Sequence, residues 1–215
     1  MEGGVHRVAL RHPRLAEGLP DRRALHRRVG LLRVLPERRP GELLPIPVRQ
    51  RREVAPGELY FPHPEYGGRW SDPHDIGVVI LKKPVRSPAP GRLPSEGFLD
   101  DLRDADVLAD ATFVSVGYGT DENIQDTNVR MYSVSSFRNL HDAWPYMSQN
   151  PHLGNGGTCF GDSGGPTYYR DANGVETQVA VTSWGDTVCK PQNNNYRVDT
   201  ASSLGFIGDV IRTYG

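Results

Sequence analysis

Short runs of hydrophobic residues separated by polar turns dominate the second part of the chain. Residues 76–81 form a continuous apolar run with the length of a buried strand. Residues 111–119 read as a strand closed by glycines, and residues 129–137 alternate like another strand. An Asn-Gly pair at residues 173–174, between two apolar runs, is a strong hairpin-turn signal. These patterns predict an all-β fold.

Two segments depart from this strand pattern. Residues 88–108 are polar and proline-rich, and we expect them to cross the surface as a link between two barrels. Near the C-terminus the spacing predicts a short helix, which Ser202 or Ser203 can cap. The residues expected on its apolar face are Leu204, Ile207, Val210 and Ile211.

Composition agrees with many short strands joined by turns. The 215 residues include 24 glycines and 18 prolines, and this length suits one large all-β domain or a double barrel. A net charge of −1 gives no whole-chain argument for nucleic acid or an anionic membrane. No apolar run approaches the roughly 20 residues of a membrane span. We expect a monomer with no nucleic-acid or membrane partner.

The first quarter of the chain is anomalous. Residues 1–56 contain 13 of the 22 arginines and seven prolines, but no Lys, Ser, Thr, Asn, Cys or aromatic residue. Three interpretations compete: a disordered basic arm that binds nucleic acid or acidic partners, a linker or pro-segment, and translation of GC-rich DNA in the wrong frame. The aromatic residues that stack on bases are absent from this segment, which weakens the first.

The stretch with the clearest chemistry is residues 156–166, a serine set among glycines. Glycines allow positive φ and bring backbone N–H groups close to a reacting carbonyl, so Ser163 is a candidate nucleophile. Asp162 directly before it adds a charge that can fix the loop, and Cys159 offers a tether.

Residues 161–166, Gly-Asp-Ser-Gly-Gly-Pro, resemble the nucleophile loop of the chymotrypsin/trypsin family of serine endopeptidases. Residues 75–81 and 182–185 resemble two further segments of that family, at suitable distances. The resemblance covers residues 57–215. It implies a trypsin-like double β-barrel with a short C-terminal helix, in which the first barrel is incomplete, and polypeptides as substrates.

The resemblance also implies roles for individual residues. Ser163 would attack the peptide carbonyl, and the N–H groups of Gly161 and Ser163 would form the oxyanion hole. Asp75 would orient the general-base histidine and stabilise its imidazolium form. Asp162 would be structural. No cofactor and no metal ligand is expected.

A substrate pocket follows from the same resemblance. Gly157 would lie at the base of this pocket, where trypsin-like preference for Arg or Lys needs an aspartate, so we expect an apolar or small substrate side chain instead. The expected pocket residues are Gly157, Thr158, Ser183, Trp184 and Gly185.

The two cysteines leave alternatives open, because such a pair reads as a disulfide in an exported protein and as buried thiols in a cytosolic one. The resemblance favours a Cys159–Cys189 disulfide across the pocket and a secreted protein. No secretory signal is recognisable in the arginine-rich N-terminus.

The catalytic histidine is missing from its expected place. The family order is His, Asp, Ser, which excludes His141 and His152. His63 is expected at the surface, and His74 adjoins Asp75, so in an extended strand the two side chains would face opposite ways. His26 stands near the required position, but its neighbours Leu, Arg and Arg are not the small residues of the family.

The frame hypothesis accounts for this gap. Read one base later with permitted GC-rich codons, residues 5–27 can spell a strand beginning S-G-T-L followed by L-T-A-A-H-C, which resembles the family's histidine segment. The base would then be encoded across Ala24 and Leu25, about 50 residues before Asp75. We therefore expect the chain as written to be inactive. A non-catalytic homologue acting as a binding module is the alternative.

Overall fold

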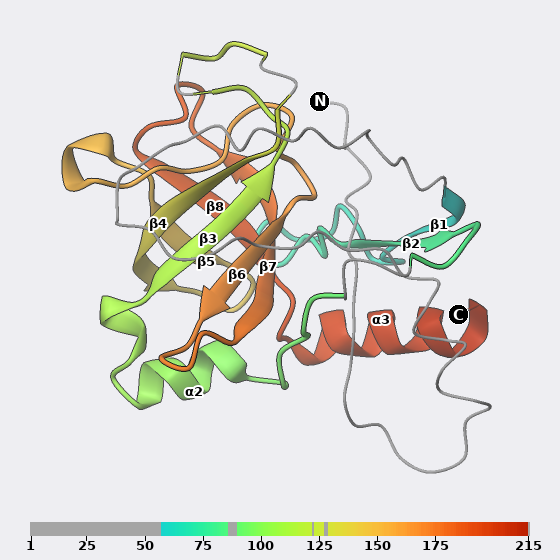
Figure 1. The fold of residues 1–215 in the computed structure, drawn as a ribbon. Coiled ribbons are helices and arrows are strands. Elements are labelled where there is room, and N and C mark those ends of the chain that lie inside the picture. Colours follow the sequence, from blue (N-terminus) through green and yellow to red (C-terminus); the bar gives the residue numbers. More distant parts are fainter. Residues whose placement is uncertain (1–56, 86–89, 122, 127–128, 215) are drawn as a thin grey trace.

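The computed structural model describes residues 57–85, 90–121, 123–126 and 129–214. The anomalous segment, its proposed frame change, and His26 lie outside these residues. Within them two unequal bodies of β-structure lie side by side, one a barrel and the other a pair of strands beside a long helix (Figure 1). No helix in the described ranges is long and apolar enough to cross a bilayer.

Six antiparallel strands form a closed barrel in the order β3-β4-β5-β8-β7-β6. The barrel strands are β3 (Thr112–Gly117), β4 (Met131–Leu140), β5 (Pro145–Ser148), β6 (Pro166–Arg170), β7 (Glu176–Gly185) and β8 (Gln192–Arg197). Closure leaves no unpaired edge, because β3 hydrogen-bonds to both β4 and β6. The expected Asn-Gly turn joins β6 to β7, with Gly174 at φ 76°.

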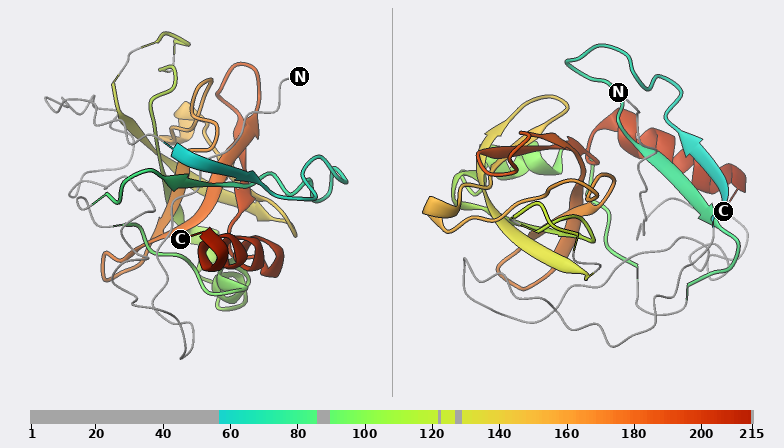
Figure 2. Two further views of the ribbon diagram at one scale, coloured as in Figure 1. Left: turned by 90° about the vertical axis from the view of Figure 1, so that its right-hand side faces the viewer. Right: turned by 90° about the horizontal axis from the view of Figure 1, so that it is seen from above.

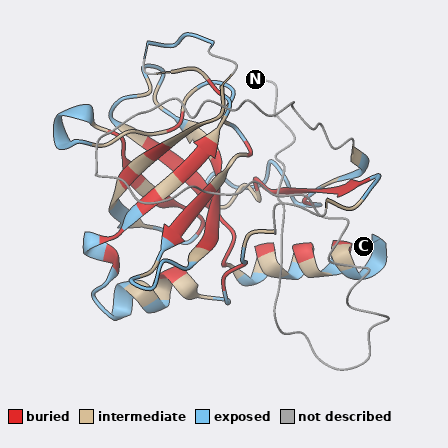
Figure 3. Ribbon diagram, viewed as in Figure 1, coloured by how far each residue is buried: buried red, intermediate tan, exposed pale blue. Residues whose placement is uncertain are grey.

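The barrel interior holds one hydrophobic cluster. Phe113, Met147 and Val179 are each fully buried there, and Tyr169 packs beside them. Figure 3 shows buried residues along the barrel strands and also along β2, which is buried at every position. Along β4, Ser133 and Ser135 are buried and the residues between and beside them are less so, which agrees with the alternation seen in the sequence.

The remaining strands, β1 (Gly57–Pro62) and β2 (Gly77–Leu81), form a two-stranded antiparallel sheet. Two strands alone are marginally stable in water, so this pair needs other partners. Helix α3 (Ala201–Tyr214) lies along it, beside the barrel (Figure 2). Buried residues of β2, β7, β8 and α3 share one cluster that includes Val78, Ile80, Val181 and Ile207.

The predicted fold class is confirmed: a complete barrel, a second incomplete sheet and a short C-terminal helix. Two details were wrong. The stretch 88–108 is not only a surface link, because it contains helix α2 (Phe98–Asp104). The helix cap is neither Ser202 nor Ser203, since the Ser203 N–H donates to the Thr200 hydroxyl at 3.1 Å.

Short 3₁₀ helices complete the described structure: η1 (Leu108–Asp110) precedes β3 and η2 (Pro151–Leu153) follows β5. A buried ion pair fixes α2 to the barrel. The Arg197 guanidinium is 2.9 Å from Asp199, whose side chain is fully buried and also accepts from the Leu99 N–H at 2.8 Å. Arg197 additionally pairs with Asp100 in the first turn of α2.

Candidate active site

The loop before β6 presents Ser163 to solvent. Two successive turns shape this loop, one closed by the Asp162 N–H on the Cys159 carbonyl at 3.1 Å and the next by the Gly165 N–H on the Asp162 carbonyl at 2.8 Å. Gly161 and Gly164 have φ of 91° and 77°, a conformation that favours glycine. The glycines of the motif therefore make the exposed turn on which the serine stands.

The oxyanion-hole candidates have unused donors. In the described part of the chain, neither the Gly161 N–H nor the Ser163 N–H donates a hydrogen bond to the protein. These two groups flank Asp162 on the same tight turn. Donors that are fixed by the backbone but not yet satisfied are what a developing oxyanion requires.

Asp162 points into the protein and holds its own loop. Its carboxylate accepts the Cys159 N–H at 2.9 Å and the Gly119 N–H at 2.8 Å. Burial raises the pKa of this carboxyl, and the two backbone hydrogen bonds act against that rise. A Cβ on Gly117 would lie 1.8 Å from the carboxylate, so the glycine at this position of β3 makes room for it.

Strand β7 connects Asp75 to the nucleophile loop. The Ser183 hydroxyl donates a hydrogen bond to the buried Asp75 carboxylate. The preceding residue, Thr182, accepts the Gly164 N–H at 2.8 Å and donates to the Gly165 carbonyl at 2.9 Å. Consecutive residues of one strand thus hold Asp75 and the two residues that follow Ser163.

A β-bulge at the same place gives Ser183 its direction. Thr182 pairs with Asn195 of β8 and Trp184 pairs with Asn194, so the ladder shifts across Ser183. A bulged residue is released from regular pairing and its side chain is re-aimed. This explains how Ser183, which the sequence placed in the pocket, comes to contact Asp75.

The residues expected at the pocket divide into two groups. Gly157 and Thr158 line a cavity of about 260 Å³ together with Cys159, Asp162 and Cys189. The residues Ser183, Trp184 and Gly185 lie at the end of β7 and do not line it. Residues of β3 and β4, among them Ser115 and Ser133, form another wall of the cavity, and Ser163 does not line it.

Gln149 fills the space beside Gly157. A Cβ on Gly157 would lie 1.7 Å from the Gln149 side-chain oxygen, so no larger residue fits without displacing it. This oxygen accepts the Thr158 N–H at 3.0 Å, and the amide nitrogen donates to the Gln192 carbonyl at 3.1 Å. The sequence offered no signal for Gln149, because its partners are distant along the chain.

Asp186 lies on the far side of Gln149, whose amide nitrogen is 3.3 Å from its carboxylate, and it is already engaged. Its carboxylate accepts the N–H groups of Val188, Lys190 and Gln192 at 3.0 to 3.2 Å. Burial tends to raise the pKa of Asp186, but these hydrogen bonds outweigh it and hold the pKa below its ordinary value. Asp186 therefore serves as the cap of its own loop.

Cys159 and Cys189 form a disulfide with their Cα atoms 5.3 Å apart. The bond joins the nucleophile loop to the turn between β7 and β8. Cys189 belongs to the loop that Asp186 caps, and both cysteines line the cavity.

No histidine in the described part of the chain is placed to act as the general base for Ser163. None of their ring nitrogens lies within hydrogen-bond distance of the Ser163 hydroxyl. His141 packs against Tyr146 at 4.6 Å between ring centroids, and His152 is exposed in η2. The expectation that His63 lies at the surface was wrong. It is 7 % exposed, because Phe206 of α3 covers one edge of its ring.

Two further tryptophans contact Trp184, the residue after Ser183, and neither contact was predicted from the sequence. Trp70, in the loop before Asp75, is 76 % exposed and its ring centroid is 5.5 Å from that of Trp184. The buried Trp144 meets Trp184 edge to face, with ring centroids 6.1 Å apart. Trp184 therefore contacts one buried and one exposed indole at the end of β7.

A closed barrel with an exposed serine on a glycine turn, linked through one strand to a buried aspartate, defines a class of protein, the serine peptidases built on β-barrels. Comparison with known families agrees with it. The family model described as Trypsin matches residues 42–205, more than half of the chain, and the chain belongs to this family. No curated protein matches the chain. Membership makes polypeptides the expected substrate class.

Proposed function

We propose that the protein is a serine endopeptidase that cleaves peptide bonds through an acyl-enzyme on Ser163. The observation that carries the proposal is the link through β7, in which Thr182 holds the nucleophile loop and Ser183 holds Asp75. The hydroxyl of Ser163 attacks the carbonyl while a histidine takes its proton, and Asp75 orients that histidine. The N–H groups of Gly161 and Ser163 receive the oxyanion.

The histidine that would take the proton of Ser163 is explained by the proposed change of reading frame. We infer that it is encoded across Ala24 and Leu25 in the alternative frame, so the chain as written has little or no peptidase activity. Support comes from the unassigned base among the described residues and from the motifs that surround Ser163. A homologue that lost its function long ago has no reason to keep all of these motifs.

The test compares the chain as written with a restored chain in which the anomalous segment, from residue 5 to residue 56, is re-read in the alternative frame. Both are oxidised and purified, and the rates of peptide hydrolysis and of labelling by a fluorophosphonate probe are measured. We expect labelling and turnover only in the restored chain, and Ser163→Ala abolishes both. In the restored chain, Asp75→Asn lowers kcat by about 10⁴-fold. Robust Ser163-dependent turnover by the chain as written overturns the frame hypothesis.

A non-catalytic homologue is the second candidate. It is favoured if the nucleotide sequence spells no histidine before Asp75 in any frame. The protein would then bind peptides along β7, as an added strand, without cleaving them. Saturable peptide binding by the chain as written, unaffected by Ser163→Ala, supports that reading.

The substrate preference follows from the pocket floor. Gly157 carries no carboxylate and Gln149 fills the space beside it, so a substrate Arg or Lys gains no ion pair there. We propose that the residue before the cleaved bond is apolar or small. Cleavage of a peptide library by the restored chain, with products identified by mass spectrometry, tests this. Dominant cleavage after Arg or Lys contradicts it.

We further propose that the protein is a secreted monomer. The Cys159–Cys189 disulfide supports this, because disulfides persist in oxidising compartments. Fractionation of the source cells and sedimentation of the purified chain measure the two properties.

A further inference from the structure

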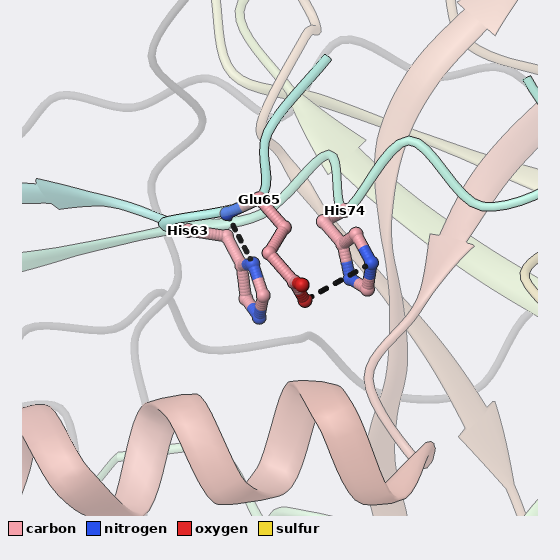
Figure 4. Close-up of side chains that lie close together, drawn as sticks. All are labelled: His63, Glu65 and His74. Carbon is pink, nitrogen blue, oxygen red and sulfur yellow. Dashed lines mark hydrogen bonds and ion pairs between the residues drawn. The ribbon is translucent and has the colours of Figure 1, made fainter. Parts of the chain in front are cut away.

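A cluster of three metal-binding side chains lies apart from Ser163, at the loop between β1 and β2. His63 and Glu65 follow β1, and His74 precedes β2. One ligand atom of each residue, a ring nitrogen or a carboxylate oxygen, lies within 4.8 Å of the others. In Figure 4 the Glu65 carboxylate approaches the His74 ring, which stacks on the ring of His63. The two ends of one loop thus bring borderline nitrogen and oxygen donors together.

The distances suit a transition-metal ion. A tetrahedral Zn²⁺ site with bonds of 2.0 to 2.1 Å separates its ligand atoms by about 3.3 Å. The His74 Nε2 and the Glu65 carboxylate are 3.5 Å apart. The rings of His63 and His74 are stacked with centroids 4.4 Å apart. An ion would draw the ligand atoms closer together and tilt the two rings out of this stack, so that their nitrogen lone pairs meet at the metal.

Ser202 of α3 decides which nitrogens are available. Its hydroxyl oxygen is 3.3 Å from the His63 Nε2 and 3.2 Å from the His74 Nδ1. If both nitrogens carry protons and donate to this oxygen, the lone pairs of the His63 Nδ1 and the His74 Nε2 are left for an ion. The Asp72 carboxylate, 3.7 Å from the His74 Nδ1, favours the same tautomer. Such outer partners orient the imidazoles of metal sites.

The His63 Nδ1 has one competing contact, the Glu65 N–H at 3.2 Å. That hydrogen bond is long, and a metal–nitrogen bond would replace it. The remaining feature is the backbone of His74, which has φ 50°. A non-glycine residue held in this region is strained, and strain of this kind clusters at functional sites.

The two imidazoles of the cluster are largely buried, whereas its carboxylate is exposed to solvent. His63 is 7 % exposed and the His74 side chain 17 %, whereas the Glu65 side chain is 72 % exposed. The imidazoles are therefore held in place while the carboxylate can close over an ion that arrives from solvent. Water can occupy the fourth position, as in open zinc sites.

We propose that His63, Glu65 and His74 bind one divalent first-row transition metal ion, with Zn²⁺ as the best fit. Two imidazoles and one carboxylate favour such an ion over Mg²⁺ or Ca²⁺, which need more oxygen ligands. The sequence alone indicated no metal ligands, because only folding brings the ends of this loop together. A bound ion joins the end of β1 to the start of β2, and through Ser202 it secures both to α3. This proposal is independent of peptidase activity.

The experiment uses the full oxidised chain, freed of metal with a chelator. Zn²⁺ binding is measured by titration calorimetry, and Co²⁺ is added as a spectroscopic probe of tetrahedral ligands. The test variants are Glu65→Gln, which changes an exposed side chain, and His74→Asn, which keeps a residue that tolerates φ 50°. The controls are Glu58→Gln and His152→Asn, which alter an exposed acid and an exposed histidine elsewhere.

We expect one equivalent of Zn²⁺ to bind and to raise the midpoint of thermal unfolding. Glu65→Gln weakens that equivalent by about 10- to 100-fold. His74→Asn removes it together with the tetrahedral Co²⁺ spectrum, and both controls bind like the parent. The histidines of the N-terminal segment are present in every variant, so they cannot produce this difference. Absence of Zn²⁺ binding in the parent, or unchanged binding in Glu65→Gln and His74→Asn, overturns the proposal. If His74→Asn fails to fold, Glu65→Gln decides.

Discussion

The barrel and the β1–β2 sheet differ in how their strands satisfy their backbone hydrogen bonds and bury their apolar side chains. Each strand of the barrel finds its hydrogen-bond partners in a closed ring, and the cluster inside is formed by the barrel with η1 and α2 beside it. Among the described residues, strands β1 and β2 pair only with each other, and their apolar residues share one cluster with residues of α3, β7 and β8. The β1–β2 sheet is therefore stable only while it stays packed against α3 and the barrel. Asp75 belongs to that smaller body, whereas Ser163 belongs to the barrel.

The largest effect is expected at the ion pair that locks α2 to the barrel. Asp199→Ala leaves the Arg197 guanidinium buried without its main partner, and such a loss costs about 3 to 5 kcal/mol in the free energy of unfolding. Urea unfolding followed by fluorescence measures it. Asp104→Ala, which removes an exposed pair with Arg103, is the control and costs at most about 1 kcal/mol. A loss below 1 kcal/mol in Asp199→Ala contradicts the argument.

The next effect concerns the disulfide that closes the nucleophile loop. Replacing Cys159 and Cys189 by alanine releases a cross-link with a sequence separation of 30 residues, which costs about 3 to 4 kcal/mol. Urea unfolding with and without a reductant provides the measurement. The reductant lowers the stability of the parent but leaves the double variant unchanged. Equal stability of parent and variant in oxidising buffer is the contrary result.

A matched pair of valines sharpens the comparison directly. Val179 of the barrel and Val78 of β2 are both fully buried, and Val→Ala at either removes about 2 kcal/mol of packing. Val179→Ala should lower the free energy of global unfolding. Val78→Ala should mainly ease local opening, seen as faster amide hydrogen exchange confined to β1 and β2. Equal exchange changes throughout the molecule in both variants would mean that the two bodies unfold as one.

The smallest effect is a pH dependence at α2. Burial tends to raise the pKa of Asp100, but the guanidinium groups of Arg197 and Arg103 outweigh it and hold the pKa below its ordinary value of 3.8. Because the folded-state pKa is depressed, this contribution is present above the unfolded pKa and is lost as pH falls through the folded value. Urea unfolding of parent and Asp100→Asn between pH 7 and pH 3 should show a difference that shrinks below pH 4. A constant difference would refute the assignment.

The sequence predicted the parts of the fold whose signals are local. Strand β3 is an apolar stretch closed by glycines, β4 alternates, β2 is a continuous apolar run, and the turn before β7 carries its Asn-Gly pair. Strand β8 escaped prediction because its residues 193–195 are three asparagines, which look like a loop. All three are buried, and the Asn193 amide donates to Thr158 at 3.3 Å, a partner 35 residues away. Helix α2 was missed for a similar reason, since the carboxylate that holds its start is that of Asp199.

The same distinction between local and distant signals applies to the candidate site. The motif at residues 161–166 identified Ser163, Asp162 and the donor-bearing turn from neighbouring residues alone. The contact of Ser183 with Asp75 was not predicted, because it depends on a bulge in β7 and on a residue 108 positions away. Gln149 was missed because only the folded chain brings it against Gly157. Sequence patterns predicted the glycine turn that carries Ser163 but not the side chains that surround it.

The bulge at Ser183 has a consequence for which changes in chain length this protein can tolerate. Regular strands flip every downstream side chain when one residue is lost, and here the extra residue is the one that reaches Asp75. Deleting Ser183 would remove the bulge and leave Thr182 and Trp184 adjacent, so the strand could still pair with β8 while its hydrogen bond to Asp75 would be lost. Between Thr182 and Gly185 the number of residues is therefore as constrained as their identity.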